Sequence, residues 1–252
     1  MPVRIILNGC FGRMGQVVSS LAEKDEDVEI VAGIDKITGS GNSFPVFKDI
    51  EECEEAADVI VDFSLPEGND RLMEYALKHS MPVVLCTTGL SESQTENVSK
   101  AAEKIAVLRS ANMSPGINVL MKVLKEVAPV LSEAGFDIEI VEKHHREKKD
   151  APSGTALALA DCINSALDES FSYVYDRSSR SERRPSKEIG ISAVRGGTIP
   201  GDHDIIFAGE DETVTISHRA YSRKIFGSGA IAAAKFLKGK GAGMYSMADV
   251  MS

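Results

Sequence analysis

Along the first half of the chain, short apolar runs alternate with longer stretches in which apolar residues recur at helical spacing. Runs that are apolar throughout are typical of parallel strands buried on both faces, and helical stretches between them are typical of βαβ units. The sequence therefore predicts strands at 3–7, 28–34, 59–63, 83–86 and 105–108, and helices at 14–22, 66–78 and 91–104.

The pattern changes after a predicted long helix at 117–131. Phe136, Ile138 and Ile140 alternate with acidic residues, which indicates a strand with one face in water. From there to residue 222 we expect antiparallel strands, including a hairpin that turns at 209–211. The polar residues 168–187 show no clear period, so we expect a long surface loop or a poorly ordered segment. The pattern also predicts strands at 188–194, 204–208 and 213–219, and a last helix at 225–237.

Composition and charge exclude several classes of protein. With 43% hydrophobic residues the chain is too apolar to be disordered, and its net charge of −10 disfavours binding to nucleic acid or to membrane surfaces. The first apolar run has three residues, far short of the about 7 to 15 of a signal peptide. We therefore expect a cytoplasmic protein. The four cysteines form no C-x-x-C pair, so we expect reduced thiols and no metal site.

A glycine-rich motif follows the first predicted strand and opens the first predicted helix. Residues 9–15 read Gly-Cys-Phe-Gly-Arg-Met-Gly. Small residues allow a tight turn whose N–H groups approach a pyrophosphate, at the partly positive start of a helix. Phe11 stands where the usual motif often has its second glycine. A phosphate-bearing cofactor is the main hypothesis, and a turn that only packs the helix on the strand is the alternative.

The end of the second predicted strand supports a dinucleotide. Asp35 lies 20 residues after Gly15, where a carboxylate can accept hydrogen bonds from the adenosine ribose. The next residue, Lys36, can hold a 2′-phosphate, so we expect both NADH and NADPH to bind. Two further strand ends should line the same cleft and contact the nicotinamide ribose or carboxamide, namely Cys86-Thr87-Thr88-Gly89 and Ser110-Ala111-Asn112-Met113.

A second cluster of candidate residues lies at 142–155, which we call the cationic segment. Four fixed cations and two imidazoles occur within residues 143–149, in a chain whose net charge is −10. Ser153 is a plausible N-cap, so the N–H groups of Gly154 and Thr155 would form a site for a carboxylate. Taken alone, such a run of charge is usually a solvated face. Together with the helix start, it predicts a binding site for a small anion.

Within the cationic segment, His144 is in phase with the apolar side of its predicted strand. A shielded imidazole or ammonium near other cations can be tuned towards neutrality and can transfer protons. His144 and Lys148 are therefore the candidates for proton transfer. A histidine that merely ends a strand is the alternative.

Taken together, these motifs resemble the 4-hydroxy-tetrahydrodipicolinate reductase (dihydrodipicolinate reductase) family of bacterial diaminopimelate and lysine biosynthesis. The resemblance covers almost the whole chain, and the block from His144 to Thr155 is its most specific part. The motifs that carry it are Gly9 to Gly15, Val61 to Ser64, Cys86 to Gly89, Asn112 to Asn118, His144 to Thr155 and Arg195 to Gly197.

The resemblance implies an α/β fold, with a Rossmann-like doubly wound parallel sheet and a second α+β domain for substrate binding and oligomerisation. Residues 1–114 plus 225–252 would bind the dinucleotide. Residues 115–224 would bind a small dicarboxylate substrate and join four subunits through a mixed sheet. The implied reaction uses NADH or NADPH to reduce the hydroxylated cyclic imine to tetrahydrodipicolinate, with loss of water.

The family's site residues transfer onto matching positions. His144 resembles the proton donor/acceptor and Lys148 the proton donor. His145, Gly154 and Thr155 resemble carboxylate contacts, assisted by Arg223. The implied cofactor contacts are Gly9, Cys10, Phe11, Gly12, Arg13, Met14, Asp35, Lys36, Cys86, Thr87, Thr88, Ser110, Ala111, Asn112 and Met113. Cys86 replaces a glycine that is common in relatives.

Two other functions share part of this pattern. Another Rossmann oxidoreductase on a small acid, such as an aspartate dehydrogenase, would have the glycine motif but would not need the cationic segment. A non-catalytic dinucleotide sensor would not need an imidazole and an ammonium beside an anion site, and a DNA-binding version would need a basic domain.

Overall fold

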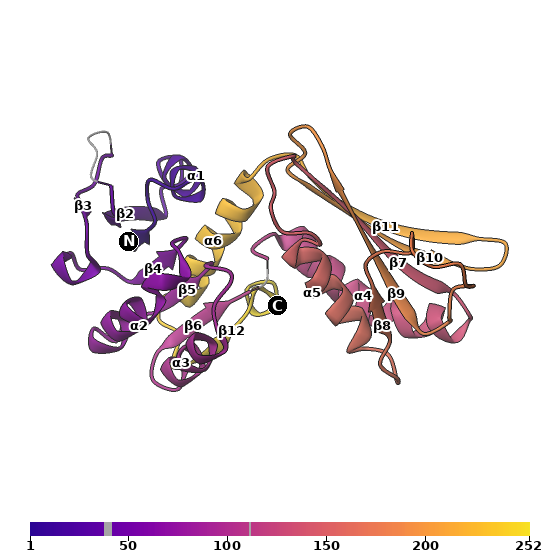
Figure 1. Cartoon of the computed structure of the whole chain (residues 1–252). Helices are drawn as coiled ribbons and strands as arrows, with labels where there is room; N and C mark the ends of the chain where they lie inside the picture. Colours follow the sequence, from indigo (N-terminus) through magenta and orange to yellow (C-terminus); the bar gives the residue numbers. More distant parts are fainter. Residues whose placement is uncertain (38–41, 111) are drawn as a thin grey trace. The chain divides into compact units, whose positions relative to one another are not determined.

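A computed structural model describes residues 1–37, 42–110 and 112–252, and the chain falls into two compact units (Figure 1). The first unit combines Met1–Pro115 with Arg223–Ser252, and the second is Gly116–Ser222. Each unit has its own sheet and its own hydrophobic core.

The first unit is built on a parallel sheet, as predicted. Its order among the described residues is β12-β6-β5-β4-β1-β2-β3. This order reverses direction between β1 and β4, and in such sheets ligands bind at the carboxyl ends of the strands near that reversal. Two of its strands, β3 with two residues and β12 with three, were not predicted from the sequence because they are too short to show a period. The strands are β1 (Val3–Asn8), β2 (Val28–Ile34), β3 (Val46–Phe47), β4 (Val59–Asp62), β5 (Val83–Leu85), β6 (Ala106–Arg109) and β12 (Gly243–Tyr245).

Helices cover both faces of this sheet, which confirms the doubly wound class. Ile5 and Leu7 pack with α1 (Arg13–Ala22), α6 (Lys224–Leu237) and α7 (Met247–Val250), whereas Ile6 packs with α2 (Asn69–Lys78) and α3 (Glu92–Ala102). A capping box begins α3, because the Ser91 hydroxyl accepts from the Gln94 N–H at 3.2 Å and the Gln94 side chain accepts from the Ser91 N–H. Two short 3₁₀ helices complete this unit, η1 (Ile50–Glu52) and η2 (Pro66–Gly68).

The second unit has a five-stranded mixed sheet with the order β11-β10-β7-β9-β8 in the described chain. Two helices, α4 (Pro115–Glu133) and α5 (Gly154–Asn164), pack on one face and bury Ile138 and Ile140. Figure 1 shows both helices on the same side of the sheet. The strands are β7 (Asp137–His144), β8 (Ser172–Val174), β9 (Glu188–Arg195), β10 (Gly201–Ala208) and β11 (Thr213–Ala220).

The expectation of antiparallel strands was wrong for part of this sheet. β10 is antiparallel to β7 and β11, but β7 pairs with β9 in parallel, and so does β8. The reason is α5, which lies between β7 and β9 in sequence and acts as a crossover that returns the chain in the same direction. Alternation of apolar and acidic residues had indicated one wet face, and a wet face does not fix strand direction.

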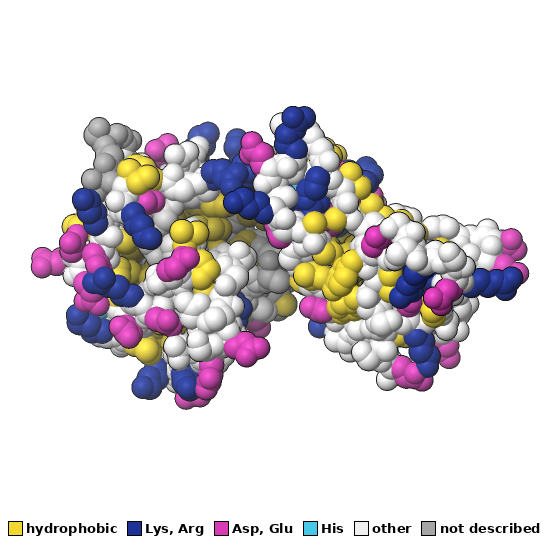
Figure 2. Space-filling model, viewed as in Figure 1, with side chains coloured by type: hydrophobic (Ala, Val, Ile, Leu, Met, Phe, Trp, Pro, Cys, Tyr) yellow, Lys and Arg dark blue, Asp and Glu magenta, His cyan; other side chains and the backbone are white. Residues whose placement is uncertain are grey.

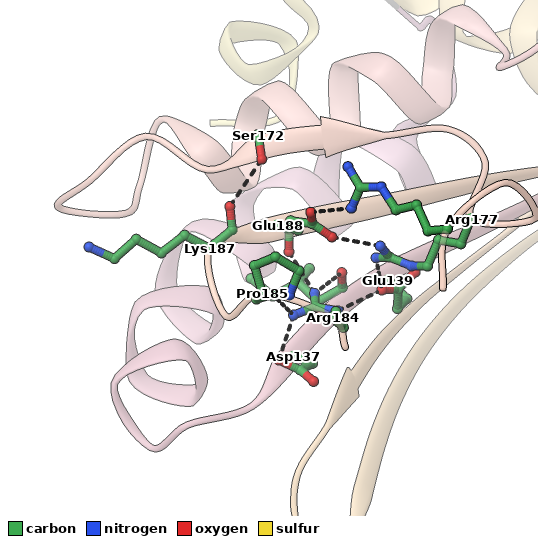
Figure 3. A network of polar contacts seen from close by, with 10 residues as sticks. Asp137, Glu139, Ser172, Arg177, Arg184, Pro185, Lys187 and Glu188 are labelled. Carbon is green, nitrogen blue, oxygen red and sulfur yellow. Dashed lines mark hydrogen bonds and ion pairs between the residues drawn. The ribbon is translucent and has the colours of Figure 1, made fainter. Parts of the chain in front are cut away.

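Residues 168–187, expected to be a loop or poorly ordered, contain the missed strand β8 and are tied to the sheet by arginines (Figure 3). Arg177 pairs with Glu139 and Glu188, each at 2.6 Å, and Arg184 pairs with Asp137 at 2.6 Å. The acidic partners Asp137 and Glu139 lie about forty residues earlier, so the local sequence pattern gave no sign of these contacts.

The sheet face opposite α4 and α5 presents a different surface. Alternation of burial leaves Val141, Ile206 and Thr215 on this side, and Val194 is 45% exposed. No helix among the described residues of this unit covers that face.

Across the described chain, no helix is both long and apolar enough to span a bilayer. Figure 2 shows acidic and basic side chains interspersed over the face of the first unit that it presents.

Candidate active site

The glycine turn, residues 9–15, leads from β1 into α1. Gly9 has φ +80°, and a Cβ there would lie 2.7 Å from the Phe63 carbonyl oxygen. A Cβ on Gly15 would lie 2.2 Å from the Gly9 carbonyl oxygen. Because Gly12 caps α1 without a side chain, the first N–H groups of the helix are left for another acceptor. This geometry suits a phosphate at the helix start.

Asp35 lies directly beside the glycine turn. Its Oδ2 accepts a hydrogen bond from the Phe11 N–H at 2.9 Å, and its Oδ1 accepts one from the Ile37 N–H at 3.3 Å. Lys36 is exposed next to it. The carboxylate is therefore held at the end of β2, in the place where a ribose would be recognised.

A cavity of about 350 Å³ opens in the first unit at the carboxyl ends of β4, β5 and β6. It brings together many of the residues predicted to contact the cofactor, namely Met14, Cys86, Thr87, Thr88, Ser110, Asn112 and Met113. Ala111 lies outside the described residues. The remaining lining was not predicted from the sequence and consists of Phe63, Ser64, Leu65, Pro66 and Phe226. Phe226 comes from α6, so only the fold reveals its place.

Some residues of the glycine turn do not line this cavity. Cys10 is 1% exposed, and its Sγ would lie 2.7 Å from a Cβ on Gly33. Burial, aided by the charge of Asp35, raises the pKa of the Cys10 thiol to about 11. Cys10 therefore packs the turn against β2 as a neutral thiol, and only its backbone can serve a ligand.

A buried carboxylate ties together three strand ends beneath the cavity. Asp62 is 0% exposed at the end of β4, where its oxygens accept from Asn8 Nδ2 at 2.8 Å and from Thr87 Oγ1 at 2.6 Å. The Ser64 N–H donates to it at 3.1 Å. Burial raises the pKa of Asp62 against the opposing effect of these hydrogen bonds. This group fixes the ends of β1, β4 and β5 relative to one another.

The residues of the first unit fit a dinucleotide. Gly15 lets the start of α1 pack directly against the backbone of Gly9 and Cys10, and Gly12 has no side chain to occupy the first N–H groups of the helix. The neighbouring cavity offers hydroxyl and amide groups between apolar side chains. Such a lining, mostly apolar with a few polar groups, is typical of cofactor sites.

In the second unit, β7 places Glu142 and His144 on its buried side, as the phase of the sequence predicted for His144. Glu142 is 0% and His144 7% exposed, and Nδ1 of His144 lies 2.6 Å from Oε2 of Glu142. Burial lowers the pKa of His144, the hydrogen bond and charge of Glu142 oppose this, and Lys148 and Arg195 lower it further.

The predicted helix start is also present. Ser153 caps α5, because its hydroxyl accepts from the Ala156 N–H at 3.1 Å. Lys148 lies 2.8 Å from Asp150. Partial burial tends to raise the pKa of Asp150, but the hydrogen bond and charge of Lys148, with help from the Gly154 N–H, hold this pKa below its usual value. A carboxylate of the chain thus already lies between Lys148 and the start of α5, where an anion site was predicted.

Three members of this cluster, Glu142, Arg195 and His203, were not predicted from the sequence as functional residues. Arg195 on β9 pairs with Glu142 at 2.6 Å, and His203 on β10 lies edge-on to His144 with ring centroids 5.2 Å apart. Burial, followed by the charge of His144, lowers the pKa of His203 to about 3, so this ring is neutral. Glu142 could have been found from the sequence, because an acidic residue at a position that the alternating pattern buries needs a partner.

The remaining predicted residues are distributed over both units. His145 is half-buried at the end of β7, and Gly154 and Thr155 begin α5, all in the second unit. Arg223 belongs to the first unit, where it is the N-cap residue of α6. No three His, Cys, Asp or Glu side chains among residues 1–37, 42–110 and 112–252 are grouped to hold a metal ion.

Comparison with protein families gives two matches that together span the chain. The model for the N-terminus of dihydrodipicolinate reductase matches residues 3–113, and the model for its C-terminus matches residues 116–251.

Individual proteins give the same result. The chain is 54% identical over 251 residues to a 4-hydroxy-tetrahydrodipicolinate reductase of Caldanaerobacter subterraneus, covering 100% of this chain and 99% of the relative. It is 47% identical to the Clostridium tetani protein of that name, covering 98% and 96%. Among solved structures, the dipicolinate-bound dihydrodipicolinate reductase from Paenisporosarcina sp. TG-14 has a TM-score of 0.81 at 24% identity, with both chains covered fully.

Proposed function

The chain belongs to the dihydrodipicolinate reductase family, and on this premise we propose that it reduces 4-hydroxy-tetrahydrodipicolinate to tetrahydrodipicolinate with NADH or NADPH. The reaction serves diaminopimelate and lysine biosynthesis. The observation that carries the proposal at the level of residues is the carboxylate position between Lys148 and the start of α5, beside the buried His144.

The first unit would bind the cofactor. The N–H groups at the start of α1 would hold the pyrophosphate, and Asp35 would accept hydrogen bonds from the adenosine ribose, with Lys36 next to a 2′-phosphate. The cavity lined by Thr87, Thr88 and Asn112 would hold the nicotinamide end. When bound, the nicotinamide supplies the hydride for the reduction.

The second unit would bind the substrate, a ring with two carboxylates. One carboxylate replaces that of Asp150 at Lys148 and at the N–H groups of Gly154 and Thr155, and His145 contributes to this recognition. The ring loses water and gains a hydride at the conjugated carbon, and Lys148 or His144 delivers the proton that keeps the product from accumulating charge. Arg223 assists from the first unit.

We assign residues 1–114 plus 225–252 to cofactor binding and residues 115–224 to substrate binding and tetramer formation. The proposed homotetramer is supported by the sheet face opposite α4 and α5. On this face Val194 is 45% exposed and Val141 and Ile206 are partly buried, beside the Lys143–Asp204 ion pair, and no helix of the described residues covers it. Subunit contacts are typically made by such mixed apolar and polar surfaces. We place the enzyme in the cytoplasm.

A coupled assay tests the proposed function directly. A dihydrodipicolinate synthase supplies the unstable substrate, and the absorbance of NADH or NADPH is followed after addition of the purified protein. We expect oxidation of the cofactor only when the synthase and both of its substrates are present. If cofactor binding is intact but no oxidation occurs with either nucleotide, the proposal is wrong and a dinucleotide-binding sensor becomes the better interpretation.

A further inference from the structure

The carboxylate of Glu142 is the centre of a buried polar cluster in the second unit. Its Oε2 lies 2.6 Å from Nδ1 of His144 and accepts a hydrogen bond from Nη1 of Arg195 at 2.7 Å. Its Oε1 accepts hydrogen bonds from Nη2 of Arg195 at 2.6 Å and from the Ser153 N–H at 3.0 Å. Glu142 is 0% exposed, so its buried charge depends on these four hydrogen bonds, above all on the guanidinium that pairs with both oxygens.

We propose that Glu142 and Arg195 are positioning residues for His144. In this arrangement, Glu142 holds the imidazole as the tautomer protonated at Nδ1, and Arg195 prevents Glu142 from drawing a second proton onto the ring. The proposal rests on the proposed function only in giving His144 a part in proton transfer. The geometry of the cluster stands independently of it.

The tautomer follows from the donors and acceptors around the ring. An ionised carboxylate can only accept hydrogen bonds, so the ring nitrogen that faces Oε2 at 2.6 Å must carry a hydrogen. Burial opposes ionisation of Glu142, but the hydrogen bonds from Arg195 and His144 hold its pKa below the usual value. In the neutral ring, Nε2 is therefore left as a hydrogen-bond and proton acceptor.

Gly201 lies against the Nε2 edge of the ring. A Cβ on Gly201 would lie 2.9 Å from Nε2, so the glycine leaves space at the nitrogen that has the free electron pair. Any side chain at this position would press on the reactive edge of the ring.

Charged and titratable groups reach His144 from several elements. Glu142 comes from its own strand, Arg195 from β9, His203 from β10, and Lys148, paired with Asp150, from the loop before α5. His203 stays neutral, and its Nε2 lies 3.1 Å from the hydroxyl of Ser153. Burial of the ring, helped by the charges of Lys148 and Arg195, outweighs Glu142, which favours the imidazolium, and so lowers the pKa of His144 and keeps it neutral near pH 7.

This balance makes two variants move the pKa of His144 in opposite directions. In Arg195→Met, Glu142 becomes an unpaired buried carboxylate that shares a proton with the ring, so we expect the pKa of His144 to rise by about one unit or more. In Glu142→Gln, the attraction is lost while Arg195 remains, so we expect this pKa to fall. Arg195→Lys retains the charge without the two-pronged pairing and should lie between wild type and Arg195→Met.

The experiment is a pH titration of ring nitrogens by NMR, with ¹⁵N-labelled histidine in the full chain. The protein has five histidines, and the signal that disappears in His144→Gln belongs to His144. In wild type near pH 7.5 we expect the chemical-shift pattern of a neutral ring protonated at Nδ1. A ring protonated at Nε2, or an equal pKa of His144 in wild type, Arg195→Met and Glu142→Gln, would overturn the proposal.

Folding and function are separated by additional readouts. Circular dichroism checks each variant, and if Arg195→Met does not fold, Arg195→Lys against Glu142→Gln still tests the opposite shifts. In the coupled assay, Glu142→Gln should lower kcat about tenfold or more while the Kd for NADH is unchanged. Inactive wild-type protein with the expected titration would reject the proposed function but not the positioning roles. Active protein without the expected titration would reject the positioning roles alone.

Discussion

The backbone N–H of Phe11 donates a 2.9 Å hydrogen bond to the carboxylate of Asp35, joining the glycine turn to the end of β2. The same carboxylate thus has two tasks in the proposed function. One oxygen fixes the backbone that approaches the pyrophosphate, and the carboxylate as a whole recognises the ribose. Variants of Asp35 can separate these tasks.

Asp35→Ala is expected to raise the KM for NADH about tenfold or more, because a charge-assisted hydrogen bond to the ribose hydroxyls is worth about 1.5–3 kcal/mol. The KM for NADPH should rise less, since its 2′-phosphate is repelled by the carboxylate and attracted by Lys36. Asp35→Asn is the matched control, because its amide oxygen still accepts from the Phe11 N–H. Equal losses for both nucleotides in Asp35→Ala would mean that this carboxylate does not distinguish them.

His144→Gln is expected to lower kcat about 10²- to 10⁴-fold, the usual contribution of a positioned proton-transfer group. Cofactor binding, measured by quenching or enhancement of nicotinamide fluorescence, should remain because the residues proposed to bind the cofactor lie in the first unit. His79→Gln is the control, since His79 stacks on Tyr75 of α2 at the exposed surface. An unchanged turnover would remove His144 from the chemistry.

Lys148→Ala is expected to impair both substrate binding and turnover. Loss of a charged partner for a carboxylate costs about 1.5–3 kcal/mol, so KM for the substrate should rise about ten- to a hundredfold, and kcat should fall with the loss of a proton donor. Lys149→Ala removes the same charge from an exposed neighbour and should change KM less than threefold. A normal KM with only a small decrease in kcat would contradict the assignment of Lys148.

Asp62→Asn tests the buried carboxylate beneath the cavity by its pH dependence. Burial raises the pKa of Asp62 in the folded protein above its usual 3.8, so folding favours the protonated form and stability decreases as pH rises from about 3.8 through the raised value. Asparagine retains an acceptor for Asn8 and Ser64 and presents an amide to Thr87. Urea unfolding should find the variant more stable than wild type at pH 7.

The difference between these two proteins should disappear below about pH 3, where the wild-type carboxyl is protonated in both the folded and the unfolded state. Asp62→Ala is the control, because it leaves the donors of Asn8, Ser64 and Thr87 without their acceptor and should be less stable at every pH. A lower stability of Asp62→Asn than of wild type at pH 7 would contradict the prediction, because it would show that the hydrogen bonds from Asn8, Ser64 and Thr87 outweigh the cost of burying the ionised carboxylate.

Much of the fold could be predicted because periodicity reports burial. β2 matches its predicted range of residues 28–34, and α6 differs from its prediction by one residue. Strand direction in the second unit was not accessible in the same way, because the wet face of β7 is equally compatible with a parallel or an antiparallel neighbour. The helix α5 between β7 and β9 was the decisive signal, and it was already visible in the sequence.

The parts of the candidate site that depend on local sequence could be predicted, and the parts that depend on pairing between distant residues could not. The turn at Gly9 and the cap at Ser153 are local features. In contrast, the contacts of Glu142 with Arg195 and of His144 with His203 join residues more than fifty positions apart. Only the arrangement of β7, β9 and β10 brings these partners together.

The first unit is discontinuous in sequence, because α6 and β12 from the last thirty residues complete its sheet and cover one face. Ala230, Ile231 and Leu237 fill the core against Val3 and Leu7, so this core can close only after α6 has been synthesised. The second unit is synthesised before the core of the first unit can close. Its own hydrophobic core gives it the means to fold before the first unit is complete.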